Sequence, residues 1–188
     1  MNKQTQRDGT AFARAARGDK LREECGVFGV SLNDATDYAE AAGITYNALL
    51  ALQHRGQEGA GIAVCSGNAI TCRKSVGLVD AVFSSESLMA VPKSGAAVGH
   101  VRYSTTGANT MQNVQPFVTE FLTGRIATVH NGNVTNAGEM REKLEPFGLD
   151  FSATSDSEVI SSLIAYKTLK AGNLLDGAVA AAKLLVGA

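Results

Sequence analysis

The chain has 188 residues, 45% of them hydrophobic, and its 17 Lys and Arg nearly balance its 18 Asp and Glu. This composition fits one globular domain, gives no general reason to expect nucleic-acid binding, and includes no apolar run long enough to span a bilayer. The three cysteines lack a metal-binding spacing, and their odd number favours a reducing compartment, so we expect a cytoplasmic protein.

The first 24 residues form a polar, charge-rich leader. They lack the apolar region of a secretory signal, and the four acids among their Arg and Lys residues argue against a mitochondrial presequence. We therefore expect residues 1–24 to be a leader or propeptide and residues 25–188 to be the folded domain.

The first half of the folded part mixes strand and helix patterns. We predict a buried strand, a helix ending near Gly56, and the two strands of a hairpin, over residues 25–31, 38–53, 60–65 and 69–74. Cys65 and Cys72 fall in the hairpin, where we expect them to pack as small apolar residues.

The second half continues with two strands and then three helices. The strands are expected over residues 96–103 and 125–130. Capping-box patterns at 136–139 and 155–158 predict two helix starts, the first helix stopping near Pro146 and Gly148, and a last helix is expected over 174–186. Strands and helices in blocks, without regular βαβ alternation, predict an α+β fold.

Cys25 stands at the head of the first strand, directly after the leader. It can be a small buried residue that opens a strand. Alternatively, a cut before it would give it both a thiol and a free α-amine, which together supply a nucleophile and a general base near neutral pH.

Two further segments each allow a structural and a functional interpretation. Residues 53–61 can be an ordinary helix exit, or a glycine-rich stretch that lets the backbone approach a ligand. Arg102 ends a predicted strand beside three hydroxyl residues, where it can form a structural salt bridge or hold a carboxylate through two parallel hydrogen bonds.

Asn131-Gly132 and Asp156 are similarly ambiguous. Asn-Gly is a hairpin-turn signal, but the Asn131 amide and the Gly132 N–H could also form an oxyanion hole. Asp156 suits a helix start, or could bind an ammonium group. Taken together, a thiol, a carboxylate binder, an oxyanion donor pair and an ammonium binder are the parts needed to cleave the side-chain amide of glutamine.

Six motifs in order resemble the glutaminase domain of the amidophosphoribosyltransferase family, a class II N-terminal-nucleophile (Ntn) amidotransferase. They are Cys25-Gly26-Val27-Phe28-Gly29, residues 52–62 (LQHRGQEGAGI), Gly99-His100-Val101-Arg102-Tyr103, Asn113-Val114-Gln115-Pro116, His130-Asn131-Gly132-Asn133 and Thr154-Ser155-Asp156-Ser157-Glu158. The resemblance covers residues 25–188 and implies a four-layer αββα Ntn-hydrolase sandwich.

The resemblance also implies roles for individual residues. Cys25 would be the nucleophile, its own α-amine the base, and Asn131 with the Gly132 N–H the oxyanion hole. Arg102 would hold the glutamine carboxylate and Asp156 its ammonium group, helped by the Gly132 carbonyl. Supporting substrate contacts are expected from Arg55 and Thr105.

In this family, released ammonia passes to a phosphoribosyltransferase domain and displaces pyrophosphate from phosphoribosyl pyrophosphate. We expect that domain to be absent here and the sandwich to be incomplete at its C-terminus, because the chain ends at Ala188 and lacks an Asp-Asp motif. The alternative is a non-catalytic fragment or subunit that depends on another polypeptide. The resemblance implies Mg²⁺, a 4Fe–4S cluster and a homo-oligomer for a full-length enzyme, but no cofactor, nucleic acid or membrane partner for this chain.

Overall fold

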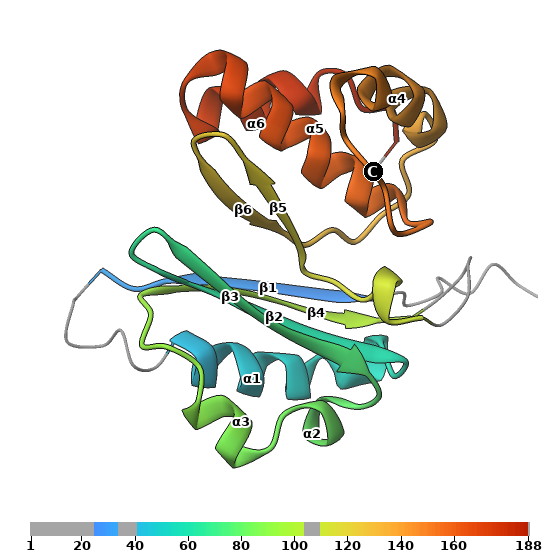
Figure 1. The fold of residues 1–188 in the computed structure, drawn as a ribbon. Coiled ribbons are helices and arrows are strands. Elements are labelled where there is room, and N and C mark those ends of the chain that lie inside the picture. The colour runs from blue at the N-terminus through green and yellow to red at the C-terminus, as the bar shows by residue number, and fades with distance from the viewer. Residues whose placement is uncertain (1–24, 34–40, 104–109, 188) are drawn as a thin grey trace, which may run out of the picture.

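The computed structural model describes residues 25–33, 41–103 and 110–187. Figure 1 shows four layers: short helices α1 to α3, a four-stranded sheet, the β5–β6 hairpin, and helices α4 to α6. This arrangement confirms the α+β class and the αββα order of layers. Within the described residues the second sheet has two strands.

The larger sheet is antiparallel throughout, with strand order β1-β4-β2-β3. Its strands are β1 (Gly26–Ser31), β2 (Gly59–Ser66), β3 (Ala69–Val76) and β4 (Ala96–Arg102). Gly26 pairs with Val101, so the beginning of β1 lies beside the end of β4. This register places Cys25 next to Tyr103, the residue that follows β4.

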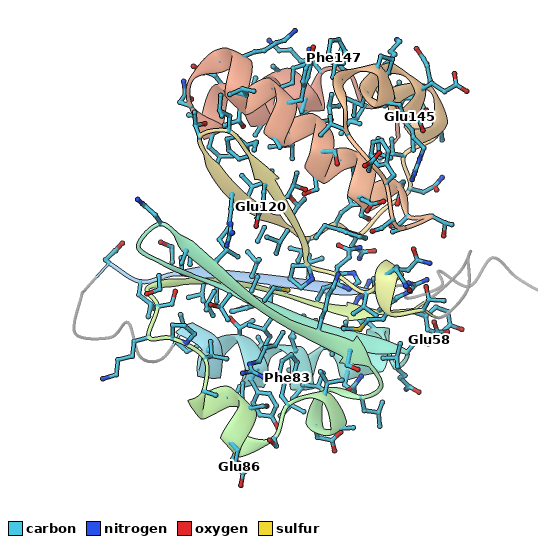
Figure 2. The ribbon with its side chains drawn as sticks, viewed as in Figure 1. Glu58, Phe83, Glu86, Glu120, Glu145 and Phe147 are labelled. Atoms are coloured by element: carbon cyan, nitrogen blue, oxygen red, sulfur yellow. The ribbon has the colours of Figure 1, made fainter. Side chains whose placement is uncertain are left out.

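One face of this sheet packs on α1 (Ala41–Ala51), α2 (Val79–Val82) and α3 (Ser85–Met89). The core between them is apolar and includes Leu49, Ala60, Ile62, Val64 and Val101. Phe83 also lies there, 2% exposed and edge-on to Tyr46, whereas Glu86 points outward (Figure 2). Gly99 admits α1 closely, because a Cβ at Gly99 would lie 2.6 Å from Thr45 Cγ2.

The upper half of the molecule consists of the β5–β6 hairpin and the helices that cover it, and it has its own apolar core. It comprises β5 (Phe117–Phe121), β6 (Gly124–Thr128), α4 (Ala137–Leu144), α5 (Asp156–Ala171) and α6 (Leu174–Ala182). The side chains that meet between the three helices are Met140, Leu144, Val159, Leu163 and Ala181. The described residues also form three 3₁₀ turns, η2 (Gln53–Arg55), η3 (Met111–Asn113) and η4 (Glu145–Phe147).

Most predicted elements are present. The strand over 25–31, the hairpin, the strands near 96–103 and 125–130, and the helices after 136 and 155 are confirmed within one or two residues. β5, α2 and α3 were not predicted, and α6 ends at Ala182 rather than 186. The predicted helix over 38–53 is described from Ala41, because residues 34–40 lie outside the described ranges.

Several local predictions were wrong. Cys65 is exposed rather than packed. By contrast, the predicted helix end near Gly56 is confirmed, because Gly56 is the C-cap of η2. Its lack of a side chain also allows a close approach to β4, where a Cβ would lie 2.6 Å from the Val101 carbonyl carbon. Asn136 makes no side-chain cap, since its amide binds the backbone of Leu184 and Val186 instead. No helix in the described ranges has the length and apolarity needed to cross a membrane.

Candidate active site

A cavity of about 810 Å³ lies where the start of β1 and the end of β4 meet the loop after β6 and the start of α5. Its lining combines residues from the end of the larger sheet with residues from the upper half of the molecule. Its polar lining includes Cys25, His100, Arg102, Asn113, Gln115, His130, Gly132, Thr154, Asp156 and Ser157. Residues far apart in the sequence therefore meet at one site.

Cys25 is held at the cavity through both its side chain and its backbone. The Tyr103 N–H donates to Cys25 Sγ at 3.4 Å, and Sγ lies at the same distance from the Tyr103 carbonyl oxygen. Arg55 Nε donates to the Cys25 carbonyl at 2.8 Å. The Cys25 backbone has φ +52°, a left-handed conformation that is uncommon for a residue with a side chain and that occurs often at functional sites.

β4 supplies two charged or polar residues to the cavity because alternate residues of a strand share a face. Val101 points into the apolar core, while His100 and Arg102, on either side of it, line the cavity. Arg102 is 7% exposed. A buried guanidinium beside an open polar cavity is suited to bind a carboxylate through paired hydrogen bonds.

His100 is fully buried, and neither ring nitrogen makes a hydrogen bond of ordinary geometry within the described residues. Burial, followed by the positive charge of Arg102, lowers the pKa of His100 to about 3. The His130 backbone lies close enough to oppose this shift, and the His130 ring adds to it. His100 is therefore neutral at physiological pH and adds no charge beside Arg102.

Asp156 is the first residue of α5, whose N-cap Ser155 accepts a hydrogen bond from the Ser157 N–H at 3.2 Å. The helix dipole favours an acidic side chain at this position. Asp156 Oδ2 also accepts from the Val134 N–H at 2.8 Å, which ties the loop after β6 to α5. The carboxylate lines the cavity, where its remaining acceptor capacity could receive an ammonium group.

The loop 130–134 carries the predicted oxyanion hole. Gly132 lines the cavity, whereas Asn131 is exposed and is not among the lining residues. At the start of the loop, Gln115 exchanges hydrogen bonds with both the N–H and the carbonyl of His130.

The structure thus brings Cys25, Arg102, Gly132 and Asp156 to one cavity. Arg55 holds the Cys25 backbone from outside the lining, and Thr105 lies outside the described residues. The sequence predicted no role for His100 or Gln115, although each lies within one of the six motifs. His100 could have been identified from its spacing to Arg102, because two residues that are two positions apart on a strand lie on the same face.

The described residues contain no group of three His, Cys, Asp or Glu side chains that could hold a metal. None of the three cysteines, all of which lie in the described ranges, forms a disulfide. Burial raises the pKa of the Cys72 thiol, against the opposing charge of Lys74. The described residues therefore do not offer a donor set that fits a metal ion or an iron–sulfur cluster.

Comparison with known proteins bears on what this cavity does. A glutamine amidotransferase domain family matches residues 100–184. Amidophosphoribosyltransferase 3, chloroplastic, of Arabidopsis thaliana is 44% identical over 162 residues, which are 86% of this chain and 29% of that protein. A solved structure of the allosteric regulatory enzyme of purine biosynthesis matches with a TM-score of 0.74 at 40% identity, covering 86% of this chain and 33% of that one.

The chain is a glutamine amidotransferase domain of the amidophosphoribosyltransferase family. The glutamine phosphoribosylpyrophosphate amidotransferase of B. subtilis, solved with ADP and GMP, is similar as well, with a TM-score of 0.71 and 39% identity over 86% of this chain and 33% of that one. The chain spans about a third of the length of these family members. The family is thus the one that the six motifs indicated.

Proposed function

We propose that this chain hydrolyses the side-chain amide of glutamine with Cys25 as the nucleophile. One observation carries the proposal: Cys25, Arg102, Gly132 and Asp156 line a single cavity. Arg102 is suited to the α-carboxylate of glutamine and Asp156 to its α-ammonium group. With the substrate held by these two residues, its side-chain amide would extend toward Cys25.

In the proposed reaction, the Cys25 thiolate attacks the amide carbon, a C–S bond forms, and the carbonyl electron pair moves onto oxygen. The Gly132 N–H and the Asn131 amide are proposed to stabilise that oxyanion. The Cys25 α-amine accepts the thiol proton and passes it to the leaving nitrogen, which departs as ammonia. Water then hydrolyses the glutamyl thioester to glutamate and restores the thiol.

The α-amine can act only after the peptide bond between residues 24 and 25 is cut. We therefore propose that residues 1–24 are a propeptide. Intact-mass analysis of active protein is expected to give a chain that begins at Cys25. Full activity in a chain that retains Met1–Glu24 would falsify this maturation step.

For the whole protein we propose the reaction named for the B. subtilis relative. Ammonia from glutamine would displace pyrophosphate from phosphoribosyl pyrophosphate, giving 5-phosphoribosylamine for purine biosynthesis. This step needs a phosphoribosyltransferase domain in addition to the glutaminase domain. Mg²⁺, a 4Fe–4S cluster, a homo-oligomeric assembly and a cytoplasmic location remain predictions for the full-length enzyme.

The proposal is tested with processed protein and a glutamine analogue that carries a diazoketone. We expect a covalent adduct on Cys25 by peptide mass spectrometry, and release of ammonia and glutamate from glutamine itself. Cys25→Ala should abolish the adduct and lower kcat by at least ~1,000-fold, as expected for loss of a nucleophile.

Cys65→Ser is the matched control, because Cys65 is exposed at the far end of β2 and does not line the cavity. It should keep both labelling and turnover. Soluble, processed protein that forms no adduct and releases no ammonia would instead favour the non-catalytic fragment.

A further inference from the structure

Gln115 connects the larger sheet to the loop 130–134, which carries the proposed oxyanion hole. Its side chain is 6% exposed and lies between the start of this loop and the start of α5. Gln115 Oε1 accepts from the His130 N–H at 2.6 Å, and Nε2 donates to the His130 carbonyl at 3.0 Å. One side chain therefore satisfies both backbone groups of one residue, as a neighbouring strand would.

The same amide also reaches α5. Gln115 Nε2 donates to Ser157 Oγ at 3.1 Å, and His130 Nδ1 lies 3.1 Å from the same oxygen. Ser157 Oγ donates to Asp156 Oδ1 at 3.3 Å, which leaves its two lone pairs for Gln115 and His130. Since the His130 N–H requires an acceptor, the orientation of the Gln115 amide is set by the network itself.

The other end of the loop is fixed independently. Asp156 Oδ2 accepts from the Val134 N–H at 2.8 Å. The loop is thus fastened at His130 through Gln115 and at Val134 through Asp156, with Gly132 between them on the cavity wall. Both sets of hydrogen bonds end on the first turn of α5. The loop is therefore held in a fixed position relative to Asp156, the proposed ammonium binder.

The backbone of Gln115 is fixed in turn against the larger sheet. It crosses directly over β2 at Gly61, where a Cβ would collide with the Gln115 carbonyl oxygen. Lys74 on β3 donates to the carbonyls of Val114 and Pro116 on either side. Gln115 therefore transmits the position of the sheet, which carries Cys25 and Arg102, to the loop.

We propose that Gln115 is a positioning residue for catalysis: it sets the Gly132 N–H at the distance that the tetrahedral intermediate requires. This inference rests on the proposed glutaminase function. Donors aimed at a developing oxyanion act mainly in the transition state, and a displacement of about 1 Å can cost about 100-fold in rate. Loss of Gln115 should accordingly lower kcat and leave the KM for glutamine nearly unchanged.

The test compares Gln115→Met with Thr119→Val in the processed chain. Thr119 Oγ1 bonds Ser161 Oγ at 2.7 Å, one turn further along α5, so this control also removes a side-chain bond to a serine of that helix, away from the cavity. We expect Q115M to lower kcat about 100-fold at nearly constant KM and to speed hydrogen exchange over residues 130–134. T119V should change none of these quantities.

Gln115→Glu is the second variant, should Q115M fail to fold. It keeps an acceptor for the His130 N–H and loses both donated bonds, so kcat should again fall. If wild-type protein is active and both variants match T119V in kcat and in exchange, the positioning role is overturned and the glutaminase function stands. If processed wild-type protein neither hydrolyses glutamine nor reacts with the diazoketone, the glutaminase function fails and this inference fails with it.

Discussion

The two faces of the larger sheet have different roles, and β4 shows the contrast within four residues. Toward α1 it presents Gly99 and Val101, which pack in an apolar core. Toward the upper half it presents His100 and Arg102, which line the cavity. A single strand thus contributes stability through one face and chemistry through the other, so substitutions at adjacent positions should separate the two properties.

Within β4, the largest expected effect comes from the polar face, at Arg102. Arg102→Leu removes the proposed partner of the glutamine carboxylate, and hydrogen bonds to a charged group contribute about 1.5–3 kcal/mol each. We expect the KM for glutamine to rise by about 100-fold or more, measured by steady-state release of glutamate.

Val101→Ala is the comparison on the apolar face of the same strand. Val101 is fully buried, so its truncation should lower the free energy of unfolding by about 1–2 kcal/mol and leave KM unchanged. Urea denaturation of both variants checks this difference. A KM for V101A as high as that of R102L would show that the faces are not independent.

The second effect concerns pH and His100. Because the folded-state pKa of His100 is about 3 and the ordinary value is 6.5, the unfolded chain binds a proton that the folded chain does not. Between pH 6.5 and 3, stability should therefore fall as pH falls, by about 1.4 kcal/mol per pH unit from this group.

His100→Leu removes that contribution while keeping an apolar side chain at a buried position. Urea midpoints at pH 7.5, 5.5 and 4.5 should fall less steeply for H100L than for the wild type, since other titrating groups are common to both proteins. Parallel curves would mean that His100 is solvated in the folded state.

The contrast between faces also explains what could be predicted from the sequence. The strand over 96–103 was predicted from the sequence, and Cys25, Arg102 and Asp156 were identified because each stands at the end of an element with a side chain suited to one part of the glutaminase reaction. Gln115 could not be assigned a role, because its partners His130 and Ser157 are 15 and 42 residues away and meet it only in the folded chain.

The two capping-box patterns failed in part, because hydrogen bonds to other segments replaced the expected caps. Asn136 has the sequence pattern of an N-cap, but its amide binds the backbone near the end of the described chain. Glu158 stands where a capping box would place it, yet its carboxylate accepts from Ser152 and Ala153 instead. Both side chains satisfy backbone groups of neighbouring segments, which no pattern within the helix itself reports.

The sharpest comparison makes the same substitution, glycine to alanine, on each face of the sheet. Gly99 pairs with Ile62, next to the pair between Gly61 and His100. A Cβ at Gly99 would press on Thr45 and Leu49 of α1, whereas a Cβ at Gly61 would press on the backbone of Gln115. Overpacking of this kind costs about 1–3 kcal/mol of stability. Gly99→Ala and Gly61→Ala should therefore both unfold at lowered urea concentrations, and Gly61→Ala at the lower of the two, because its Cβ meets backbone rather than side chains.

Their kinetics should nevertheless differ. Gly61→Ala displaces the segment that fastens the loop 130–134, so it should lower kcat, while Gly99→Ala displaces α1 and should leave kcat unchanged in the folded fraction. The measurement is kcat at a temperature where circular dichroism shows both variants folded. Equal kcat values would mean that contact between β2 and Gln115 does not position the loop 130–134. The functional difference between the two faces would then be limited to β4.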